Sequence, residues 1–234
     1  MTKPPVEKLL PDKPDLPPHI PYPKTLIIGL RGVAVRSEYK FGIGFEFKKR
    51  PGLTSFLQKL ARSYEIVIFG DEESSLVNEI CEALDPNTQI IFGRIGHEST
   101  LLKDGRYIRD LSYMNRPIKD IVCIDFDPDK FYLHKDHVIK VPEWTGEEDD
   151  RILLDIIPFL EHIAQPGIDV VKELDRYGRD NPSSKFNEIQ TARRDMIHQK
   201  RNTGFGGMMN KLSSTSSNQM NNEEQMFPSQ FKNE

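Results

Sequence analysis

Residues Thr25–Val35 read TLIIGLRGVAV, and the apolar run at the start of this stretch is typical of a strand buried inside a parallel sheet. Two later stretches follow the same plan, EIVIFG at Glu65–Gly70 and IVCIDFDP at Ile121–Pro128. Each of the three runs into a short polar segment. Because helical patterns separate them, they predict an α/β fold with an open, largely parallel sheet and a site at the carboxyl ends of the strands.

Helix and hairpin signals fill the segments between and after these strands. Pro51-Gly52 opens a helix predicted over Leu53–Arg62, and a second helix is predicted over Ser74–Leu84. Asp104-Gly105 tolerates positive φ and therefore predicts a hairpin turn. An amphipathic helix is predicted after Asp150, whose carboxylate suits the positive end of a helix.

Composition predicts four parts of the chain. Residues 1–21 form a Pro-rich extended arm, interpreted as a surface tether, since eight of the 17 prolines precede residue 24. The folded domain is predicted over residues 22–165, and a helical extension follows over residues 166–201. The tail, residues 202–234, is rich in Gly, Met, Ser, Asn and Gln, a composition for which disorder in isolation is the default.

Charge and hydropathy exclude several classes of function. The formal net charge of −4 over 234 residues gives no basic field for nucleic acid. The longest apolar runs are too short to span a bilayer, so any membrane association is expected to come through partners. The N-terminus carries neither a secretory signal nor a transit peptide, so that targeting is internal or the chain begins after a removed or separate anchor. Histidines lack metal-ligand spacing, and we expect no metal and no cofactor.

Four motifs occur together and in a fixed order: KKRPG, YEIVIF, RDLSYMNR and DDRILLDIIPFLE. With these, the chain resembles the family of large receptor subunits of the presequence translocase in the mitochondrial inner membrane. The soluble domain of that family is similar to the small C-terminal-domain phosphatases of the haloacid dehalogenase superfamily. The resemblance covers roughly Leu9–Asp195. It implies a dehalogenase-like sheet with hairpin insertions, and a place at the mitochondrial inner membrane on a side that it does not specify.

The same resemblance implies that the phosphatase chemistry is lost. Gly29 and Arg31 stand where the superfamily has its nucleophilic aspartate and its acid–base aspartate. Gly70 stands at the phosphate-holding hydroxyl, Arg109 at the basic position, and Asp125 keeps one metal-ligand position. Glycine offers no nucleophile, and arginine cannot donate its proton near neutral pH. We therefore expect a pseudophosphatase with no metal site.

Two sets of residues are candidates for partner binding. The acidic set is Asp71, Glu72 and Glu73, together with Glu46, Glu65 and Glu79. The resemblance implies that an acidic groove accepts a basic, amphipathic presequence helix, and an ordinary solvated surface is the alternative. The aromatic set is Tyr39, Phe41, Phe45 and Phe47 in a hairpin-like stretch. The resemblance implies that this hairpin touches the channel-forming subunit, and burial on the domain is the alternative.

Three functions remain open on the sequence. The leading hypothesis is a catalytically inactive, protein-binding receptor subunit of the inner-membrane translocase. The first alternative is an architectural subunit of a large inner-membrane assembly, such as a respiratory complex, derived from that receptor. The second alternative, a divergent phosphatase, requires a carboxylate nucleophile elsewhere in the chain.

Overall fold

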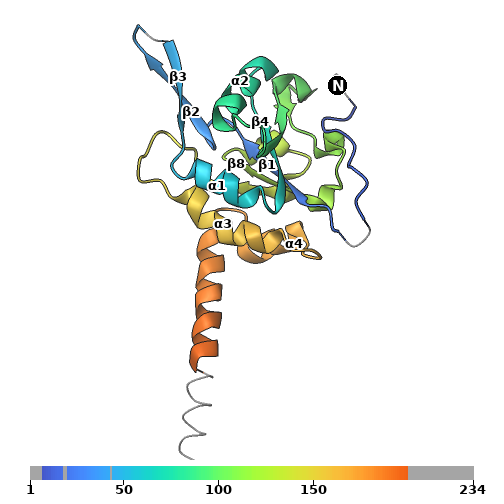
Figure 1. Ribbon diagram of the computed structural model, residues 1–234, viewed down its shortest axis with the longest axis vertical. Helices are drawn as coiled ribbons and strands as arrows, with labels where there is room; N and C mark the ends of the chain where they lie inside the picture. The colour runs from blue at the N-terminus through green and yellow to red at the C-terminus, as the bar shows by residue number, and fades with distance from the viewer. Residues whose placement is uncertain (1–6, 18–19, 43, 200–234) are drawn as a thin grey trace, which may run out of the picture. The chain divides into compact units, whose positions relative to one another are not determined.

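The computed structural model describes residues 7–17, 20–42 and 44–199. The chain divides into two compact units, residues 1–187 and 188–234, and the first holds the sheet (Figure 1). The strands of this sheet are β1 (Lys24–Gly29), β4 (Tyr64–Phe69), β5 (Ile91–Ile95), β8 (Ile121–Asp125) and β9 (Val138–Lys140). They are all parallel and lie in the order β5-β4-β1-β8-β9. The predicted α/β fold is confirmed, with β1 at the centre of the sheet.

Helices and short 3-10 turns connect the strands. The α-helices are α1 (Leu53–Leu60), α2 (Ser74–Leu84), α3 (Ile152–Ile163) and α4 (Val170–Tyr177). The 3-10 turns are η1 (His97–Ser99), η2 (Leu111–Met114), η3 (Ile118–Asp120), η4 (Pro128–Phe131) and η5 (Lys135–His137). Residues 183–187 of the first unit and 188–199 of the second are also helical. None of the helices in the described part of the chain has the length and hydropathy that a membrane crossing requires.

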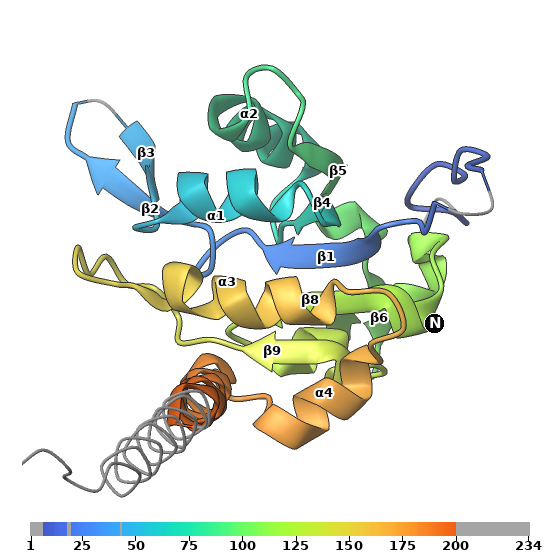
Figure 2. The same ribbon diagram turned by 60° about the horizontal axis from the view of Figure 1, so that its bottom comes forward.

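The two faces of the sheet are covered in different ways. Successive side chains of a strand point to opposite faces, so Ile27 lies on one face and its neighbours Leu26 and Ile28 on the other. Ile27 belongs to a buried cluster with β4, β8, η2 and η4 residues such as Val67, all of them under 5% exposed. Helices α1 and α3 pack against each other over the opposite face (Figure 2). Tyr64 at the start of β4 ties the sheet to α3 by donating to the Leu160 carbonyl at 2.7 Å.

The N-terminal arm is fixed to the domain over part of its length. Leu10 is only 2% exposed and belongs to the same cluster as Ile27. The Leu9 amide donates to the Tyr113 carbonyl at 2.8 Å, and Arg116 Nη1 donates to the Pro11 carbonyl at 2.8 Å. Over these residues the arm is a packed strap rather than the tether that its proline content suggested. The predicted limits of the domain, residues 22 and 165, stay predictions.

Two hairpins project from the sheet connections. The first pairs β2 (Val35–Lys40) with β3 (Gly44–Lys49), and the second pairs β6 (Leu101–Lys103) with β7 (Arg106–Ile108). Asp104 and Gly105 have φ of 52° and 76°, which confirms the predicted Asp-Gly turn of the second hairpin. The edge strand β5 was not predicted from the sequence, because Gly93 and Arg94 interrupt its apolar run. The helix α2 has the predicted bounds.

Candidate functional site

The carboxyl ends of β1, β4 and β8 meet at one edge of the sheet, because the three strands are parallel neighbours. They end at Gly29, Phe69 and Asp125, and Gly70 follows Phe69. A Cβ atom on Gly29 would lie 2.4 Å from Asp125 Oδ2 and 3.2 Å from Val33 Cγ2. The side chain of Asp125 therefore fills the space in front of β1 where a nucleophilic side chain would start.

Asp125 is fully buried, and both of its carboxylate oxygens have partners. Arg109 Nη1 donates to Oδ2 at 2.8 Å. The Asp127 amide donates to Oδ1 at 3.0 Å, and Lys130 Nζ forms an ion pair with the same oxygen at 3.5 Å. A buried carboxylate is tolerated when such partners satisfy it, and here two cations and one amide do so.

Arg109 links Asp125 to a second carboxylate, Asp71, in the loop after β4. Arg109 Nη2 donates to Asp71 Oδ1, and Lys130 Nζ donates to Asp71 Oδ2 at 2.7 Å. The guanidinium is 2% exposed and lies 4.6 Å from the ring centroid of Phe69 and 5.4 Å from that of Phe131. Burial disfavours the charged form of Asp71, but Arg109 and Lys130 outweigh this effect and lower the pKa of the carboxyl. The cluster thus pairs two basic side chains with two carboxylates.

Arg31 and Gly70 lie on the β1–β4 side of the same edge. Arg31 Nε forms an ion pair with Glu72 Oε1 at 2.8 Å, and its side chain is half-exposed. A Cβ atom on Gly70 would lie 2.5 Å from Val77 Cγ2 and 2.9 Å from Glu72 Oε2. Val77 and Glu72 therefore occupy the space that a phosphate-holding threonine or serine would need.

The residues at this edge do not fit a divalent cation, although the resemblance of the chain to phosphatases implies one. Magnesium requires several free oxygen ligands, and Gly29 supplies no side-chain oxygen. Both oxygens of Asp125 are already engaged by Arg109, Lys130 and an amide. Among the residues that the structure describes, no group of three or more His, Cys, Asp or Glu side chains could hold a metal ion. Arg109 and Lys130 place positive charge where a metal would need to bind.

The predicted acidic residues do not form one open groove. Asp71 and Glu72 are engaged with Arg109, Lys130 and Arg31, as described above. Glu65 is 6% exposed and forms an ion pair with Arg116 at 2.6 Å inside the domain, so it is not a surface residue. Glu73 is exposed at the N-terminus of α2, and Glu79 is exposed further along that helix. Besides the ion-paired Asp71, the exposed members of this set are thus Glu73 at the N-cap of α2, Glu79 in α2 and Glu46 in β3.

The β2–β3 hairpin is the second candidate surface. Phe41 at its tip is 97% exposed, which leaves a large aromatic side chain almost wholly in water. The backbones of Tyr39 and Phe45 are paired across the hairpin. Phe47 is partly buried and lines an apolar cavity of about 190 Å³ between the hairpin and α2. The cavity is lined by Val35, Phe47, Lys49, Glu79, Ile80, Ala83 and Leu84.

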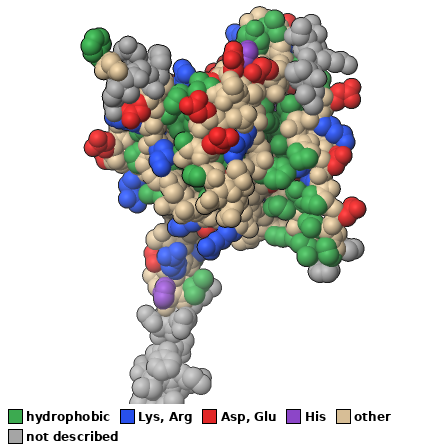
Figure 3. Space-filling view, turned by 45° about the horizontal axis from the view of Figure 1, so that its top comes forward, with side chains coloured by type: hydrophobic (Ala, Val, Ile, Leu, Met, Phe, Trp, Pro, Cys, Tyr) green, Lys and Arg blue, Asp and Glu red, His purple; other side chains and the backbone are tan. Residues whose placement is uncertain are grey.

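Figure 3 shows a face on which acidic and basic side chains are mixed among hydrophobic ones, without a large field of one sign. The cavity beside α2 combines apolar walls with Glu79 and Lys49 at its lining. We call the set Phe41, Phe47, Glu79, Ile80 and Leu84 the hairpin–α2 surface. An apolar segment with flanking basic side chains is the ligand that these side chains suit.

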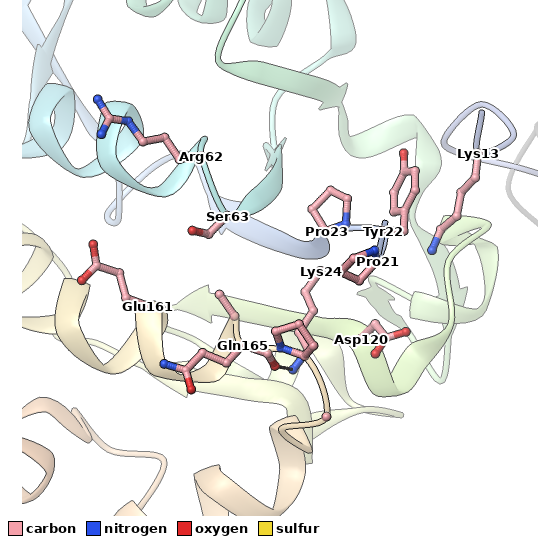
Figure 4. Close-up of a pocket in the computed structure, with 13 residues that line it drawn as sticks. Lys13, Pro21, Tyr22, Pro23, Lys24, Arg62, Ser63, Asp120, Glu161 and Gln165 are labelled. Atoms are coloured by element: carbon pink, nitrogen blue, oxygen red, sulfur yellow. Dashed lines mark hydrogen bonds between the residues drawn. The ribbon is translucent and has the colours of Figure 1, made fainter. Parts of the chain in front are cut away.

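The larger cavity, about 670 Å³, lies at the opposite edge of the sheet (Figure 4). Lys24, Ser63 and Asp120 stand at or directly before the starts of β1, β4 and β8, so this is the amino edge. Lys24 Nζ is already used there, since it donates to the Ile163 carbonyl at 2.6 Å and to the carbonyls of Gln165 and Ile168. The cavity therefore lies at the end of the sheet away from Gly29 and Asp125.

The resemblance assigned Gly29, Arg31, Gly70, Arg109 and Asp125 to one phosphatase-like site, and the structure brings these residues to one edge of the sheet. It missed Lys130 and the aromatic rings of Phe69 and Phe131. Lys130 follows Asp127-Pro128-Asp129, and its ion pairs with Asp125, five residues earlier, and with the distant Asp71 leave no sequence signal. The ring contacts of Arg109 likewise depend on tertiary packing alone.

Comparison with known proteins gives a consistent family. The family model of NLI interacting factor-like phosphatases matches residues 24–172. The chain is 34% identical to the mitochondrial import inner membrane translocase subunit TIM50-B of Drosophila melanogaster, with 82% of this chain and 47% of that protein covered. It is 35% identical to the TIM50 subunit of Homo sapiens, with 78% of this chain and 52% of that protein covered.

The chain thus spans about half the length of these relatives. Among solved structures, the RNA polymerase II CTD phosphatase Fcp1 aligns with a TM-score of 0.44 at 18% identity, over 69% of this chain and 56% of that one.

Proposed function

This chain belongs to the family of NLI interacting factor-like phosphatases, and from this membership and its TIM50 relatives we propose that it is a subunit of the mitochondrial inner-membrane import machinery that binds protein instead of hydrolysing phosphate. The observation that carries this proposal is the edge of the sheet where the site of a phosphatase is expected. Gly29 stands there without a side chain, and Asp125 is paired with Arg109. The TIM50 relatives support a location at the mitochondrial inner membrane. The geometry at Gly29 and Asp125 supports protein binding over catalysis.

The loss of catalysis has a direct test. Recombinant protein is assayed with p-nitrophenyl phosphate and magnesium, beside the variant Asp125→Asn. We expect both proteins to match the buffer background, since removing a nucleophile already costs several orders of magnitude in rate. Turnover by the wild-type chain that Asp125→Asn abolishes would identify the protein as a divergent phosphatase.

We assign partner binding to the hairpin–α2 surface. Phe41 is exposed as an anchor side chain, the cavity beside α2 is mostly apolar, and Glu73 and Glu79 lie at the N-cap and within α2. A presequence is a basic, amphipathic helix, so its apolar face suits the cavity and its cations suit these carboxylates. The aromatic candidates Tyr39 and Phe45 belong to the same hairpin, and their part in binding is included in this proposal.

Peptide binding tests this assignment. A fluorescent basic amphipathic presequence peptide is titrated with the wild-type chain, with Glu79→Lys and with Glu161→Lys, the control on the amino edge of the sheet. We expect Glu79→Lys to weaken binding by roughly threefold or more, with Glu161→Lys close to wild type. Equal effects of the two substitutions would show that binding follows net charge and not this surface.

A native pull-down from mitochondria in mild detergent tests the wider function. The tagged chain is expected to recover translocase subunits in a salt-sensitive, substoichiometric complex. Phe41→Ser should reduce that recovery, whereas Tyr132→Ser, which changes an aromatic side chain that is 54% exposed elsewhere, should not. A stable, equimolar place in a respiratory or other large assembly would instead identify an architectural subunit.

A further inference from the structure

Proline occupies every third position in one part of the N-terminal arm. Pro11, Pro14 and Pro17 follow the spacing PxxPxxP within the sequence PDKPDLP. A polyproline II helix has three residues per turn, so prolines with this spacing lie on one ridge, about 9 Å apart. We propose that residues 11–17 are a polyproline II ligand, and that its partner is a protein domain with a basic groove lined by aromatic side chains.

The backbone of this segment is extended. Residues 11–17 run without helix, strand, turn or bend. Each proline fixes its own φ, and it also moves the residue before it away from the helical region, so that most of the segment is restricted to extended conformations. In Figure 1 the arm, drawn in dark blue, runs along the outside of the domain. The segment therefore meets the two requirements of a polyproline ligand, an extended backbone and access from solvent.

Contacts with the domain turn the proline ridge outward. Leu10 and Lys13 are three residues apart and share a neighbouring ridge of the same helix. Leu10 is 2% exposed, and Lys13 is half-buried, with its Nζ 4.1 Å from the ring centroid of Tyr22. The three prolines are all exposed. One ridge thus holds the arm against the domain, and the proline ridge faces solvent.

Both ends of the segment are anchored. Arg116 Nη1 donates to the Pro11 carbonyl at 2.8 Å, and the Ile20 amide donates to the Pro17 carbonyl at 2.9 Å. A ligand that is already held in its bound conformation loses less conformational entropy when it binds. The domain therefore presents the proline ridge in a form that is ready for a partner.

The chemistry of the segment defines the groove that fits it. Grooves lined by aromatic side chains bind polyproline II ridges, since the rings pack between the prolines. Asp12 is paired with Lys8 at 2.6 Å, and the Lys13 cation is held over the Tyr22 ring. Asp15 is exposed, and no described residue forms a hydrogen bond or ion pair with it. The unpaired charge beside the ridge is negative, so the matching groove carries a basic side chain.

An array of purified SH3, WW and EVH1 domains tests the proposal, because these domains bind proline-rich segments in aromatic grooves. The full chain is applied to the array, and each domain that binds it is then titrated with the double variant Pro14→Ala/Pro17→Ala. We expect at least one domain to bind the wild-type chain and to bind the double variant at least about fivefold more weakly, as for the loss of a binding hot spot. Asp15→Lys should weaken the same binding by roughly threefold.

The matched control is Pro86→Ala, which changes an exposed proline in the turn after α2 and should bind like the wild-type chain. The Tm of the double variant should stay within about 3 °C of wild type, since both of its substitutions are on the surface. An array in which no domain binds the wild-type chain would overturn the proposal, and so would equal binding by the double variant and Pro86→Ala. Tighter binding by Asp15→Lys would overturn the basic groove.

The result is independent of the proposed role in import, because the hairpin–α2 surface includes none of these residues. Peptide titration with Glu79→Lys tests that surface, and the array tests the arm, so that the failure of one proposal is distinguishable from the failure of the other.

Discussion

At the scale of single residues, Arg50 joins three segments of the fold. Its side chain is fully buried, Nε donates to Asp150 Oδ1 at 2.9 Å, and Nη2 donates to Asp150 Oδ2 at 2.8 Å. Nη1 donates to the Pro142 carbonyl at 3.2 Å. Asp150 also accepts the Ile152 amide at 3.1 Å, at the start of α3. One arginine thus connects the base of the β2–β3 hairpin, the loop before α3 and α3 itself.

We expect Asp150→Asn to lower the free energy of unfolding by about 3 kcal/mol, because it leaves the Arg50 cation buried without a counter-charge. Urea unfolding followed by circular dichroism measures the change. Asp155→Asn, in an exposed pair with Arg151 at 3.8 Å, is the control and should change stability by about 0.5 kcal/mol or less. A loss at Asp150 no larger than at Asp155 would contradict this account of Arg50.

Asp85 gives the stability a dependence on pH. It is 3% exposed and accepts from the amides of Ile90 at 2.7 Å and Ile91 at 2.8 Å, where α2 passes into β5. Burial alone would raise the pKa of this carboxyl, but the amide donors outweigh burial and lower the pKa below its usual value of 3.8. The contribution is therefore fully present above about pH 4 and is lost as the pH falls through the lower, folded-state pKa.

Asp85→Asn should cost about 1–3 kcal/mol at pH 6, because the amide oxygen replaces the carboxylate only in part. The difference from wild type should shrink as the pH falls below about 4, since the wild-type carboxyl then becomes protonated. Urea unfolding at a series of pH values measures both proteins. A difference that stays constant down to the lowest pH at which they fold would show that the carboxylate charge is not the cause.

Gly29 is required by the packing of Asp125. A methyl group at this position would lie 2.4 Å from Asp125 Oδ2 and 3.0 Å from its Cγ, and Arg109 prevents the carboxylate from moving away. We expect Gly29→Ala to lower the free energy of unfolding by about 1–3 kcal/mol, as overpacking does. In a double-mutant cycle with Asp125→Ala, the two losses should sum to more than the loss in the double variant. Additive losses would place the cost of the methyl group elsewhere.

At the scale of elements, the N-terminal arm is part of the core and not only a connection. Leu10 reaches the buried cluster on one face of the sheet, and Asn115 Nδ2 donates to its carbonyl at 3.1 Å. Leu10→Ala should lower the free energy of unfolding by about 2–3 kcal/mol, at the low end for a buried leucine because the arm can adjust. Removal of residues 1–12 should cost at least as much.

The matched control for Leu10→Ala is Leu16→Ala, since Leu16 is 40% exposed on the same arm. It should change the free energy of unfolding by less than about 0.5 kcal/mol. Chemical unfolding measures the free energy of unfolding of the two variants and of the truncated chain. An arm that acts only as a tether would leave all three as stable as wild type.

The elements also show how far the sequence determines the fold. Continuous apolar runs predicted β1, β4 and β8, because a strand that is buried on both faces is apolar at successive positions. The edge strand β5 was missed, since Phe92 and Arg94 face outward and Gly93 breaks the run. The packing of Leu10 was also missed, because an isolated apolar pair in a proline-rich segment has no periodicity.

The candidate site could also be predicted from the sequence only in part. Gly29 and Asp125 could be placed at one edge because parallel strands bring their carboxyl ends together. The pairing of Asp71 and Glu72 with Arg109 and Arg31 joins residues far apart in the chain, and no local pattern records it. Single-sequence reasoning therefore counted these carboxylates as open acidic groups, whereas their charges are already matched inside the protein.

At the scale of the whole molecule, the division into units at residues 187 and 188 has a measurable consequence. The first unit contains the complete sheet and its own closing segments. Lys140 at the free edge of β9 bonds to the backbone of Arg179 at 2.8 Å and of Asn181 at 3.1 Å. Phe186 is 4% exposed and lies 5.4 Å from Phe159 of α3 and 5.3 Å from Tyr177 of α4, measured between ring centroids.

A fragment of residues 1–187 should therefore fold alone, with a Tm within about 2 °C of the full chain, because it loses few buried groups. A fragment of residues 1–178 removes Phe186 and the backbone partners of Lys140, and it should melt at least about 5 °C lower, since a buried phenylalanine contributes several kcal/mol. Differential scanning calorimetry of the three proteins measures both differences. Equal melting temperatures of the two fragments would show that residues 179–187 do not close the sheet. A fragment of residues 1–187 that melts far below the full chain would show that the fold depends on the second unit.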